Sequence, residues 1–366
     1  MNVLMVAAVD FPPDPRIEKE ARALIENGYT VSLICLKGDK RGSYNGIKLV
    51  RLPFGESKLP APFNWIIDYL LYCTIGTAYV YVHSIGSKVV HVHNPPDFLV
   101  PLLAPLRALG KRLIFDVHDP TQVLAASRLS GKFSKIVLPM LKIAFDCAAL
   151  SSTYVITVSD AVAELIPVDD IIIVKNSPDD EFYTLETPDI NKKVIVYCGA
   201  MVENRGLDLL MEAMKAVDNS TLLMVGTGDY LDHLKRIAPE NVQFLGKVMY
   251  SDIPSILAKS SIGILPLEPT PINLIGSPNK LFEMMAVGLP TVCTSLPGLR
   301  LIADEAALFV PYSVKGFSNG ISTLLSDKHL YSELSATAKQ KSLKFRWKTM
   351  SVPLIDLYNK IESGDK

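Results

Sequence analysis

The sequence predicts an α/β protein built from two doubly wound parallel-sheet domains, and two observations carry that prediction. Short apolar runs recur along the chain, each followed by turn residues and then by a segment with helical spacing of apolar side chains. Most runs lack polar alternation, which is typical of strands covered on both faces. The chain has 366 residues, too many for one ordinary core, so two domains of roughly 150 to 200 residues are expected.

The predicted strands fall into two blocks. Those of the first block are NVLMVAAV, TVSLICL, KVVHVHN, KRLIFDVHD and YVITVS. Those of the second block are KKVIVYCGA, STLLMVGTG, VQFLGKV, IGILPLE and PTVCTS. Helical patterns such as IEKEARALIENG and LDLLMEAMKAV separate them, so each block predicts a βαβ series.

The domain boundaries follow from composition. The stretch NSPDDEFYTLETPDINK is polar and acidic, and it separates the blocks. We therefore expect a first domain at 1–176, a linker at 177–192 and a second domain at 193–344. The tail at 345–366 has its own apolar spacing, which predicts a helix that packs back on the first domain.

Charge and cysteine content exclude several classes. The formal net charge is -1, with 37 basic and 38 acidic residues, so no bulk attraction to nucleic acid is expected. The five cysteines are scattered singly, which is typical of core residues in a reducing compartment. The first residues lack a basic leader, so a cytoplasmic protein is expected. The oligomeric state stays open.

Two long apolar segments raise the question of a membrane. The segment at 63–82 is long enough to span a bilayer but contains Asp68, and KIVLPMLKIAFDCAAL begins at Lys135. A carboxylate at mid-span costs several kcal/mol, so a buried or membrane-surface helix is favoured. Both reversible contact with the inner face of a membrane and a plain core position stay open.

Open parallel sheets bind ligands beyond the carboxyl ends of their strands, so the loops there are candidate sites. In the second block, Arg205 and Gly206 begin a helix, where free N–H groups favour an anion. Gly226 and Gly228 follow the next strand and would let backbone approach a ligand closely. The third glycine of a dinucleotide fingerprint is missing.

The first block offers polar loops on the same kind of rim. His118 and Asp119 end a strand, and the histidine would orient a substrate hydroxyl or simply hydrogen-bond within its loop. Asp14 is expected to cap a helix, and Arg16 is expected to bind an anion. The alternative is that both residues only cap the helix and contact solvent. Asn94 lies in a third loop, HVHNPPD.

The stretch SPNKLFEMMAVGLP predicts a helix with an unusual charged pair. Ser277 is expected as its N-cap, Pro278 as its first residue and Gly288 as its left-handed stop. Lys280 and Glu283 then project from one face. A surface ion pair is the alternative, although Lys before Glu is the poorer order for such a pair.

Some motifs are absent from the sequence. It contains no Asp-x-Asp, no Walker loop and no His-Glu-x-x-His. We therefore expect no cofactor and no metal site, with phosphate neutralised by Arg, Lys and helix ends.

With these residues in view, the whole chain resembles the retaining glycosyltransferases of family four. The resemblance rests on the order of its motifs, among them VDFPPDPRIEKEARALIENGYTVSLIC, VVHVHNPPD, LIFDVHD, VIVYCGAMVENRGLDLLMEAM, LLMVGTGDYLDHL and SPNKLFEMMAVGLPTVCT. It implies the GT-B fold, in which two Rossmann-like domains face each other across a cleft. The first domain would bind the acceptor and the second the nucleotide sugar.

Residue by residue, the resemblance implies a nucleotide site in the second domain. Glu283 matches the glutamate that binds the ribose hydroxyls, and Arg205 matches the basic residue that grips the diphosphate. Lys280, in a PNK-x-x-E variant found in a branch associated with cell-envelope sugars, would be a second cationic contact. His118 matches a histidine near the donor sugar. With Arg205, Lys280 and Glu283 it completes the implied catalytic set.

Two departures from the family pattern shift the remaining expectations. Ile275 stands where the family has its first glutamate, and Ala200 where it often has an arginine, so other groups must supply those contacts. The further donor-binding positions are Arg16, Gly199, Gly206, Gly226, Gly228, Gly246, Lys247, Val248, Ser277, Pro278 and Asn279. The acceptor-side positions are Asp14, Asn94 and Asp119.

The implied reaction moves a sugar from a nucleotide diphosphate to a hydroxyl of a glycan or lipid-linked acceptor, with retention and without a metal. Two alternatives stay open: a non-hydrolysing nucleotide-sugar epimerase and a non-catalytic GT-B binding subunit. The sequence does not identify the nucleotide, the sugar, the acceptor or the linkage.

Overall fold

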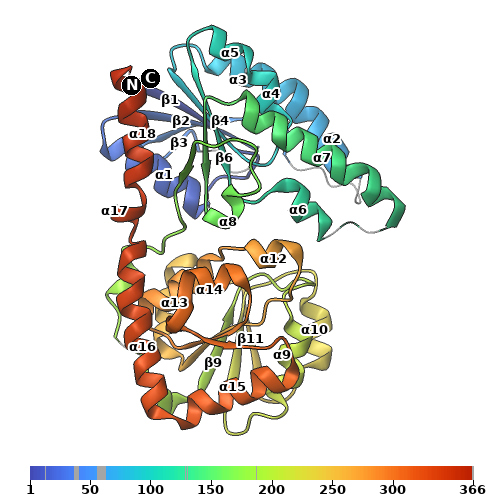
Figure 1. Ribbon diagram of the computed structural model, residues 1–366, viewed down its shortest axis with the longest axis vertical. Coiled ribbons are helices and arrows are strands. Elements are labelled where there is room, and N and C mark those ends of the chain that lie inside the picture. Colours follow the sequence, from blue (N-terminus) through green and yellow to red (C-terminus); the bar gives the residue numbers. More distant parts are fainter. Residues whose placement is uncertain are drawn as a thin grey trace. The chain divides into compact units, whose positions relative to one another are not determined.

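The structure, a computed structural model, describes residues 1–12, 14–36, 41–55, 63–127, 129, 131–186 and 188–364. The chain folds into two compact units (Figure 1). The first contains residues 1–175 and 351–366, and the second contains residues 176–350. The chain therefore passes from one unit to the other twice.

The first unit is built on an eight-stranded sheet with the order β3-β4-β2-β1-β5-β6-β7-β8. All neighbours pair in parallel except β3 and β4, which are antiparallel. Its strands are β1 (Asn2–Val6), β2 (Thr30–Cys35), β3 (Ser43–Tyr44), β4 (Ile47–Arg51), β5 (Val89–His93), β6 (Arg112–Val117), β7 (Tyr154–Thr157) and β8 (Ile171–Ile173). The chain order reverses direction between β1 and β5, which makes this the switch point of the sheet.

Helices connect these strands as the apolar spacing predicts. They are α1 (Pro15–Glu26), α2 (Phe63–Leu71), α3 (Thr77–His83), α4 (Leu99–Leu103), α5 (Pro105–Ala108), α6 (Thr121–Ala126), α7 (Gly131–Ser151) and α8 (Asp160–Ala163). A π-helix, η1 (Tyr72–Gly76), joins α2 to α3. Helix α4 packs against both α3 and α7, so these three helices are neighbours in one layer (Figure 1).

The second unit is a six-stranded sheet with the order β11-β10-β9-β12-β13-β14, parallel throughout. Its strands are β9 (Val194–Cys198), β10 (Thr221–Val225), β11 (Val242–Gly246), β12 (Ile262–Leu265), β13 (Thr291–Thr294) and β14 (Leu308–Val310). Its helices are α9 (Leu207–Met214), α10 (Leu231–Ile237), α11 (Ile253–Lys259), α12 (Pro271–Ile275), α13 (Asn279–Val287), α14 (Pro297–Ala303), α15 (Val314–Ser326), α16 (Lys328–Ser342) and α17 (Trp347–Met350). Short 3-10 turns lie at η4 (Tyr250–Asp252), η5 (Asp304–Ala306) and η6 (Leu343–Phe345).

Strand β9 illustrates why the second block reads as continuous apolar runs. Val196 and Cys198 pack into the core that contains α13, whereas Ile195 and Tyr197 pack into the core that contains α9. Both faces of the strand are therefore buried under helices. Apolar side chains at every position satisfy both cores, which confirms the predicted doubly wound architecture.

The segment predicted as a separate linker, 177–192, instead belongs to the second unit, although Thr187 lies outside the described residues. It forms two 3-10 turns, η2 (Asp180–Tyr183) and η3 (Ile190–Lys192). Phe182 is buried in the core beside α13, and the Tyr183 hydroxyl donates to Ser342 O at 3.1 Å. Two aromatic residues thus anchor a segment whose overall composition is polar.

The C-terminal tail is divided between the units. Helix α17 ends in the second unit, and α18 (Val352–Ser363), drawn in red, packs beside α1 in the first unit (Figure 1). Its buried residues are Leu354, Leu357, Tyr358 and Ile361. The Tyr29 hydroxyl donates to Asn359 Oδ1 at 2.9 Å, which joins the tail to the end of α1.

The two long apolar segments form α2 with η1 and α3, and α7. Among the described residues, no helix combines the length and the apolar character that crossing a membrane requires. Helix α7 nevertheless leaves several large apolar side chains exposed.

Candidate functional site

In the second unit, the switch point of the sheet lies between β9 and β12. Loops that leave the carboxyl ends of these strands diverge to opposite faces of the sheet, which opens a crevice suited to a ligand. The two loops are directly linked, because Asn273 Nδ2 donates to Asn204 O at 3.1 Å. The predicted donor-binding residues fall on these loops and on the helices that follow them.

The loop after β9 carries Arg205 and Gly206 to the start of α9, as predicted. Gly206 has φ +68, and no side chain caps the first turn of α9. Arg205 is half-buried and forms no ion pair within the described part of the chain. An unpaired cation next to uncapped N–H groups is a suitable environment for an anion.

The glycines of these loops lie against neighbouring backbone. A Cβ at Gly226 would lie 1.9 Å from Gly199 O, and one at Gly228 would lie 2.0 Å from Met201 O. At Gly206 the nearest atom would be Pro266 O at 1.8 Å. In each case the close approach is to a neighbouring loop of the protein, so these glycines let the loops pack together. Their contact with the donor stays a prediction.

The start of α13 also differs from the prediction. The helix begins at Asn279, with Pro278 in the N-cap position at ψ 129 and no capping side chain. Ser277 is therefore not the N-cap; its carbonyl instead accepts a hydrogen bond from Asn176 Nδ2 at 2.8 Å. Gly288, at φ +77, ends the helix as predicted. The first turn of α13 is left without a side-chain cap, like that of α9.

Lys280 and Glu283 form an ion pair on α13, with Lys280 Nζ 3.0 Å from Glu283 Oε2. The pair is not a solvated one, because the Glu283 side chain is only 2% exposed. Tyr250, which the sequence did not indicate, completes the group: its hydroxyl donates to Glu283 Oε1 at 3.2 Å, and its ring lies 5.7 Å from Lys280 Nζ. Burial and the Glu283 carboxylate raise the pKa of Tyr250, so the hydroxyl keeps its proton.

The remaining donor-side positions lie around the same edge. Gly246 ends β11 at φ +72 with open space beside it, and Lys247 is exposed next to half-buried Val248. Ile275 is the last residue of α12, and no carboxylate takes its place in α12.

In the first unit, the residues predicted as separate loop sites are joined by a buried ionic network. Arg16 is 10% exposed, and its Nη2 atom lies 3.0 Å from Glu20 Oε1 and 3.1 Å from Asp116 Oδ1. Its Nη1 atom donates to Val174 O at 2.9 Å. The guanidinium is thus matched by two carboxylates, which differs from the predicted phosphate contact. Burial opposes its charge, but Asp116 and Glu20 raise the pKa of Arg16.

Asp116 is the centre of this network. Burial alone would raise its pKa, but Arg16 and His118 hold the pKa of Asp116 well below its usual range. Its Oδ2 atom lies 3.2 Å from His93 Nδ1 and 3.4 Å from His118 Nε2. His118 is 22% exposed, and its Nε2 lies 3.1 Å from His93 Nδ1. His118 is therefore the accessible end of a buried chain of titratable groups.

Asn94, Asp119 and Asp14 have local structural partners. Asn94 Oδ1 accepts from His118 N at 2.7 Å, and its Nδ2 donates to Asp119 O at 2.7 Å, so it ties the loops after β5 and β6 together. The Asp119 side chain is exposed. Asp14 caps α1 as predicted, accepting from Arg16 N and Ile17 N. An acceptor-side role for these residues stays a prediction.

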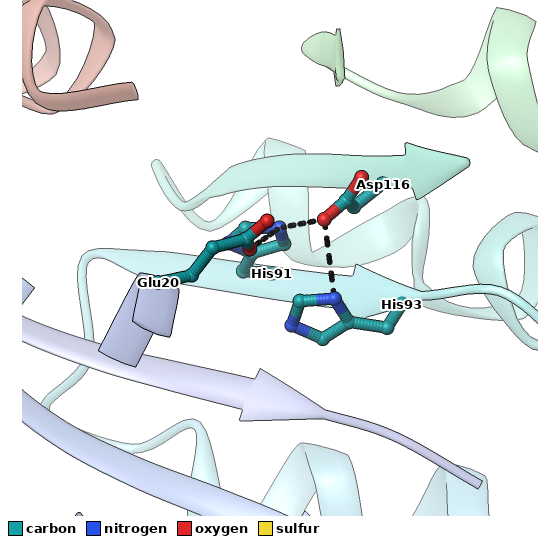
Figure 2. A group of neighbouring side chains, drawn as sticks. All are labelled: Glu20, His91, His93 and Asp116. Atoms are coloured by element: carbon teal, nitrogen blue, oxygen red, sulfur yellow. Dashed lines mark ion pairs between the residues drawn. The ribbon is translucent and has the colours of Figure 1, made fainter. Parts of the chain in front are cut away.

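The sequence did not indicate Glu20, His91 or His93 as members of this network (Figure 2). Nor did it indicate Tyr358. The signal available was the His-x-His alternation in β5, which puts His91 and His93 on one face of the strand. Their rings are stacked at 4.5 Å between centroids. Glu20 lies one helical turn after Arg16 on α1, but the contact of Tyr358 with His91 depends on the tertiary fold.

Two protein-family models match the chain. The model described as glycosyltransferase family 4 matches residues 16–168, and the model described as glycosyl transferases group 1 matches residues 192–327. Among solved structures, a sucrose-phosphate synthase from Thermosynechococcus elongatus aligns over 100% of both chains with a TM-score of 0.81 and 15% identity.

The chain has the GT-B glycosyltransferase fold. HepE of Anabaena in complex with UDP is also similar, with a TM-score of 0.75 and 15% identity over 98% of this chain and 100% of that one. Curated relatives align over shorter stretches. The sulfoquinovosyl transferase SQD2 of Arabidopsis thaliana is 21% identical over 44% of this chain and 32% of its own length.

A GDP-mannose-dependent phosphatidylinositol monomannoside mannosyltransferase of Mycobacterium tuberculosis is 23% identical over 45% of this chain and 47% of its own length. The match to this GT-B chain thus spans about a quarter to a half of the length of its curated relatives. The family models support the predicted resemblance to glycosyltransferases in both units.

Proposed function

We propose that this chain transfers a sugar from a nucleotide diphosphate sugar to an acceptor hydroxyl. The observation that carries the proposal is the arrangement at the switch point of the second unit. There, Arg205 and Lys280 stand at the uncapped first turns of α9 and α13. Two cations and two helix starts suit the diphosphate of a nucleotide sugar.

The Lys280–Glu283 pair suggests how the nucleotide is held. The diphosphate would replace Glu283 as the partner of Lys280, and Glu283 would then accept hydrogen bonds from the ribose hydroxyls. Tyr250 supports this role, because its hydrogen bond to Glu283 Oε1 fixes the carboxylate. The structural neighbour HepE was solved with UDP, which is a nucleotide of this class.

Charge on the leaving diphosphate increases as the glycosidic bond breaks. Arg205, Lys280 and the N–H groups of the two helix starts would stabilise that charge without a bound metal ion. We further propose retention at the anomeric carbon, as the resemblance to retaining glycosyltransferases of family four suggests, with a leaving phosphate oxygen taking the acceptor proton. His118 in the first unit would contact the donor sugar.

We also propose that the acceptor is a glycan or a lipid-linked molecule of the cell envelope, reached at the inner face of a membrane. The support is one face of α7, on which Ile136, Met140, Ile143 and Leu150 are 66%, 55%, 63% and 62% exposed. Lys135 and Lys142 are exposed on the same helix, where Lys142 also pairs with Asp146. An exposed apolar stripe flanked by lysines suits the interface of an anionic membrane.

The donor can be identified by thermal unfolding of the full chain with UDP, GDP and ADP and with their sugars. A ligand at 100 times its Kd stabilises the folded protein by about 2.7 kcal/mol. We expect one nucleotide class to raise the Tm. With that nucleotide sugar and a lipid-linked acceptor, NMR should detect a new glycosidic bond of retained configuration.

Three outcomes would contradict the proposal. A protein that binds no nucleotide and releases no nucleoside diphosphate would be a binding subunit. Conversion of the sugar nucleotide without an acceptor would identify an epimerase instead. A product of inverted configuration would contradict retention alone and leave transfer intact.

A further inference from the structure

Four side chains of the first unit converge in a site without access to solvent (Figure 2). They are the carboxylates of Glu20 and Asp116 and the imidazoles of His91 and His93, each 2% exposed or less. One ligand atom from each lies within 4.8 Å of the others. They come from α1, β5 and β6, three rigid elements around the switch point of the sheet.

The cluster contains polar atoms whose bonding is incomplete. His91 Nε2 is buried, forms no hydrogen bond, and lies 3.5 Å from Asp116 Oδ2 and 3.9 Å from Glu20 Oε2. Neither Glu20 oxygen forms a hydrogen bond, although Oε1 is ion-paired with Arg16. Buried polar atoms of this kind are uncommon in folded proteins and indicate a missing partner.

The charges of the buried side chains also favour a bound cation. Arg16 matches the charge of Asp116, so the second buried carboxylate, Glu20, needs either a proton or a cation beside it. A proton could supply the missing charge, but it joins only two atoms, and separations of 3.5 and 3.9 Å exceed hydrogen-bond length. An ion placed among the four ligand atoms would satisfy all of them together.

We propose that Glu20, His91, His93 and Asp116 bind a structural zinc ion. Zinc bonds of roughly 2.0 to 2.1 Å in a tetrahedron separate neighbouring ligand atoms by about 3.3 Å. The separations from Asp116 Oδ2 are 3.2 Å to His93 Nδ1 and 3.5 Å to His91 Nε2, on either side of that value. Two imidazole nitrogens and two carboxylate oxygens form a donor set that zinc accepts.

The surrounding contacts would orient these ligands. The Tyr358 hydroxyl lies 2.9 Å from His91 Nδ1, and when it accepts a hydrogen bond from Nδ1–H the Nε2 lone pair is available for the ion. Arg16 Nη2 lies closest to Glu20 Oε1 and Asp116 Oδ1, at 3.0 and 3.1 Å, and its contact with Asp116 Oδ2 is longer, at 3.4 Å. The ion would replace the contact of His93 Nδ1 with His118. All four positions would be filled by protein, so the ion would stabilise the unit rather than contact substrate.

The test measures metal on the full chain, purified without a polyhistidine tag, loaded with zinc and dialysed. Mass spectrometry should find about one zinc per chain, as a closed four-ligand site requires. Cobalt in its place should give the visible absorption bands of a tetrahedral site. Removing zinc should lower the Tm, and adding zinc should restore it.

Two variants and one control locate the ion. Glu20→Gln and His91→Ala should reduce bound zinc at least tenfold. His233→Ala removes an exposed histidine that pairs with Asp208 in the second unit, and it should keep the full amount. If a variant does not fold, the zinc content and the cobalt spectrum of the unmodified chain test the proposal without it. A folded chain that binds no zinc, or variants that bind as much, would overturn the proposal.

Discussion

At the scale of single residues, Lys280 and Glu283 form a pair that differs from an ordinary surface ion pair by its burial. Lys215 and Glu212 have the same spacing on α9 and its C-terminus, but both side chains are 50% exposed. The Glu283 side chain is 2% exposed and also bound by Tyr250. Holding a carboxylate and an ammonium out of water costs stability, which points to a functional reason for keeping them.

We expect Lys280→Ala and Arg205→Ala each to lower turnover by about a hundredfold or more, because each removes a cation from the leaving diphosphate. The measurement is the initial rate with the donor found by thermal unfolding. Lys215→Ala, which removes the exposed pair of equal spacing, should retain the full rate. Unchanged rates in both site variants would contradict the proposed diphosphate site.

Asp97 should make stability depend on pH. Its side chain is 1% exposed, and burial raises the pKa of Asp97 from 3.8 to about 6. The folded state therefore holds this proton more tightly than the unfolded state. The contribution of Asp97 to the free energy of unfolding is fully present below pH 4. It falls by up to about 3 kcal/mol as the pH rises through 6.

The comparison is urea unfolding of the parent chain and of Asp97→Asn at pH 4 and at pH 7. Asparagine does not titrate, so the difference in unfolding free energy between the two proteins should change by about 2 to 3 kcal/mol across this range. An equal pH dependence in both would show that folding does not raise the pKa of Asp97.

At the scale of elements, the glycines after β9 and β10 allow the backbones of two loops to pack in direct contact. Gly226→Ala would bring a methyl group within 1.9 Å of Gly199 O at φ +133. We expect a loss of about 1 to 3 kcal/mol in unfolding free energy from strain and overpacking. Gly42→Ala, with no atom within 4 Å of the added Cβ, is the control and should change stability little. Equal stability of both variants would contradict the packing role.

Helix α7 allows a test of membrane contact. The double variant Ile136→Asp and Ile143→Asp should reduce co-sedimentation with vesicles of anionic phospholipid at least tenfold, because it places charge on the apolar stripe. Leu301→Asp changes a side chain that is 73% exposed on α14 of the second unit and should bind like the parent chain. Vesicle binding that is equal in all three proteins, or absent from the parent, would exclude α7 as the membrane surface.

At the scale of the whole molecule, the chain's last helix completes its first unit. Leu354 on α18 is fully buried there. Leu354→Ala should therefore cost about 2 to 5 kcal/mol. Hydrogen exchange should rise in β1 and α1 while the strands of the second unit keep their protection. Val352→Ala, at a position 49% exposed on the same helix, should leave exchange unchanged. A loss of protection in the second unit instead would contradict this assignment.

Much of the fold could be predicted, because doubly covered strands such as β9 need apolar residues at every position. The helix starts at Arg205 and near Lys280 were also predictable from turn chemistry and strand order. The N-cap residue of α13 could not be predicted exactly, because Ser277 and Pro278 are both favoured near a helix start. Gly226 and Gly228 were correctly placed in a loop. The backbone that they approach, at Gly199 and Met201, lies in the loop after the preceding strand and could not be predicted from local pattern.

The sequence by itself determined the fold class, the two βαβ blocks and the loops that carry the candidate donor site, because these depend on local periodicity and turn residues. Only the tertiary structure decided that Arg16 is matched by Asp116, that Tyr250 binds Glu283, and that Tyr358 contacts His91. Those contacts join residues up to 267 positions apart. Such pairings depend on how strands and helices pack, which no local pattern encodes.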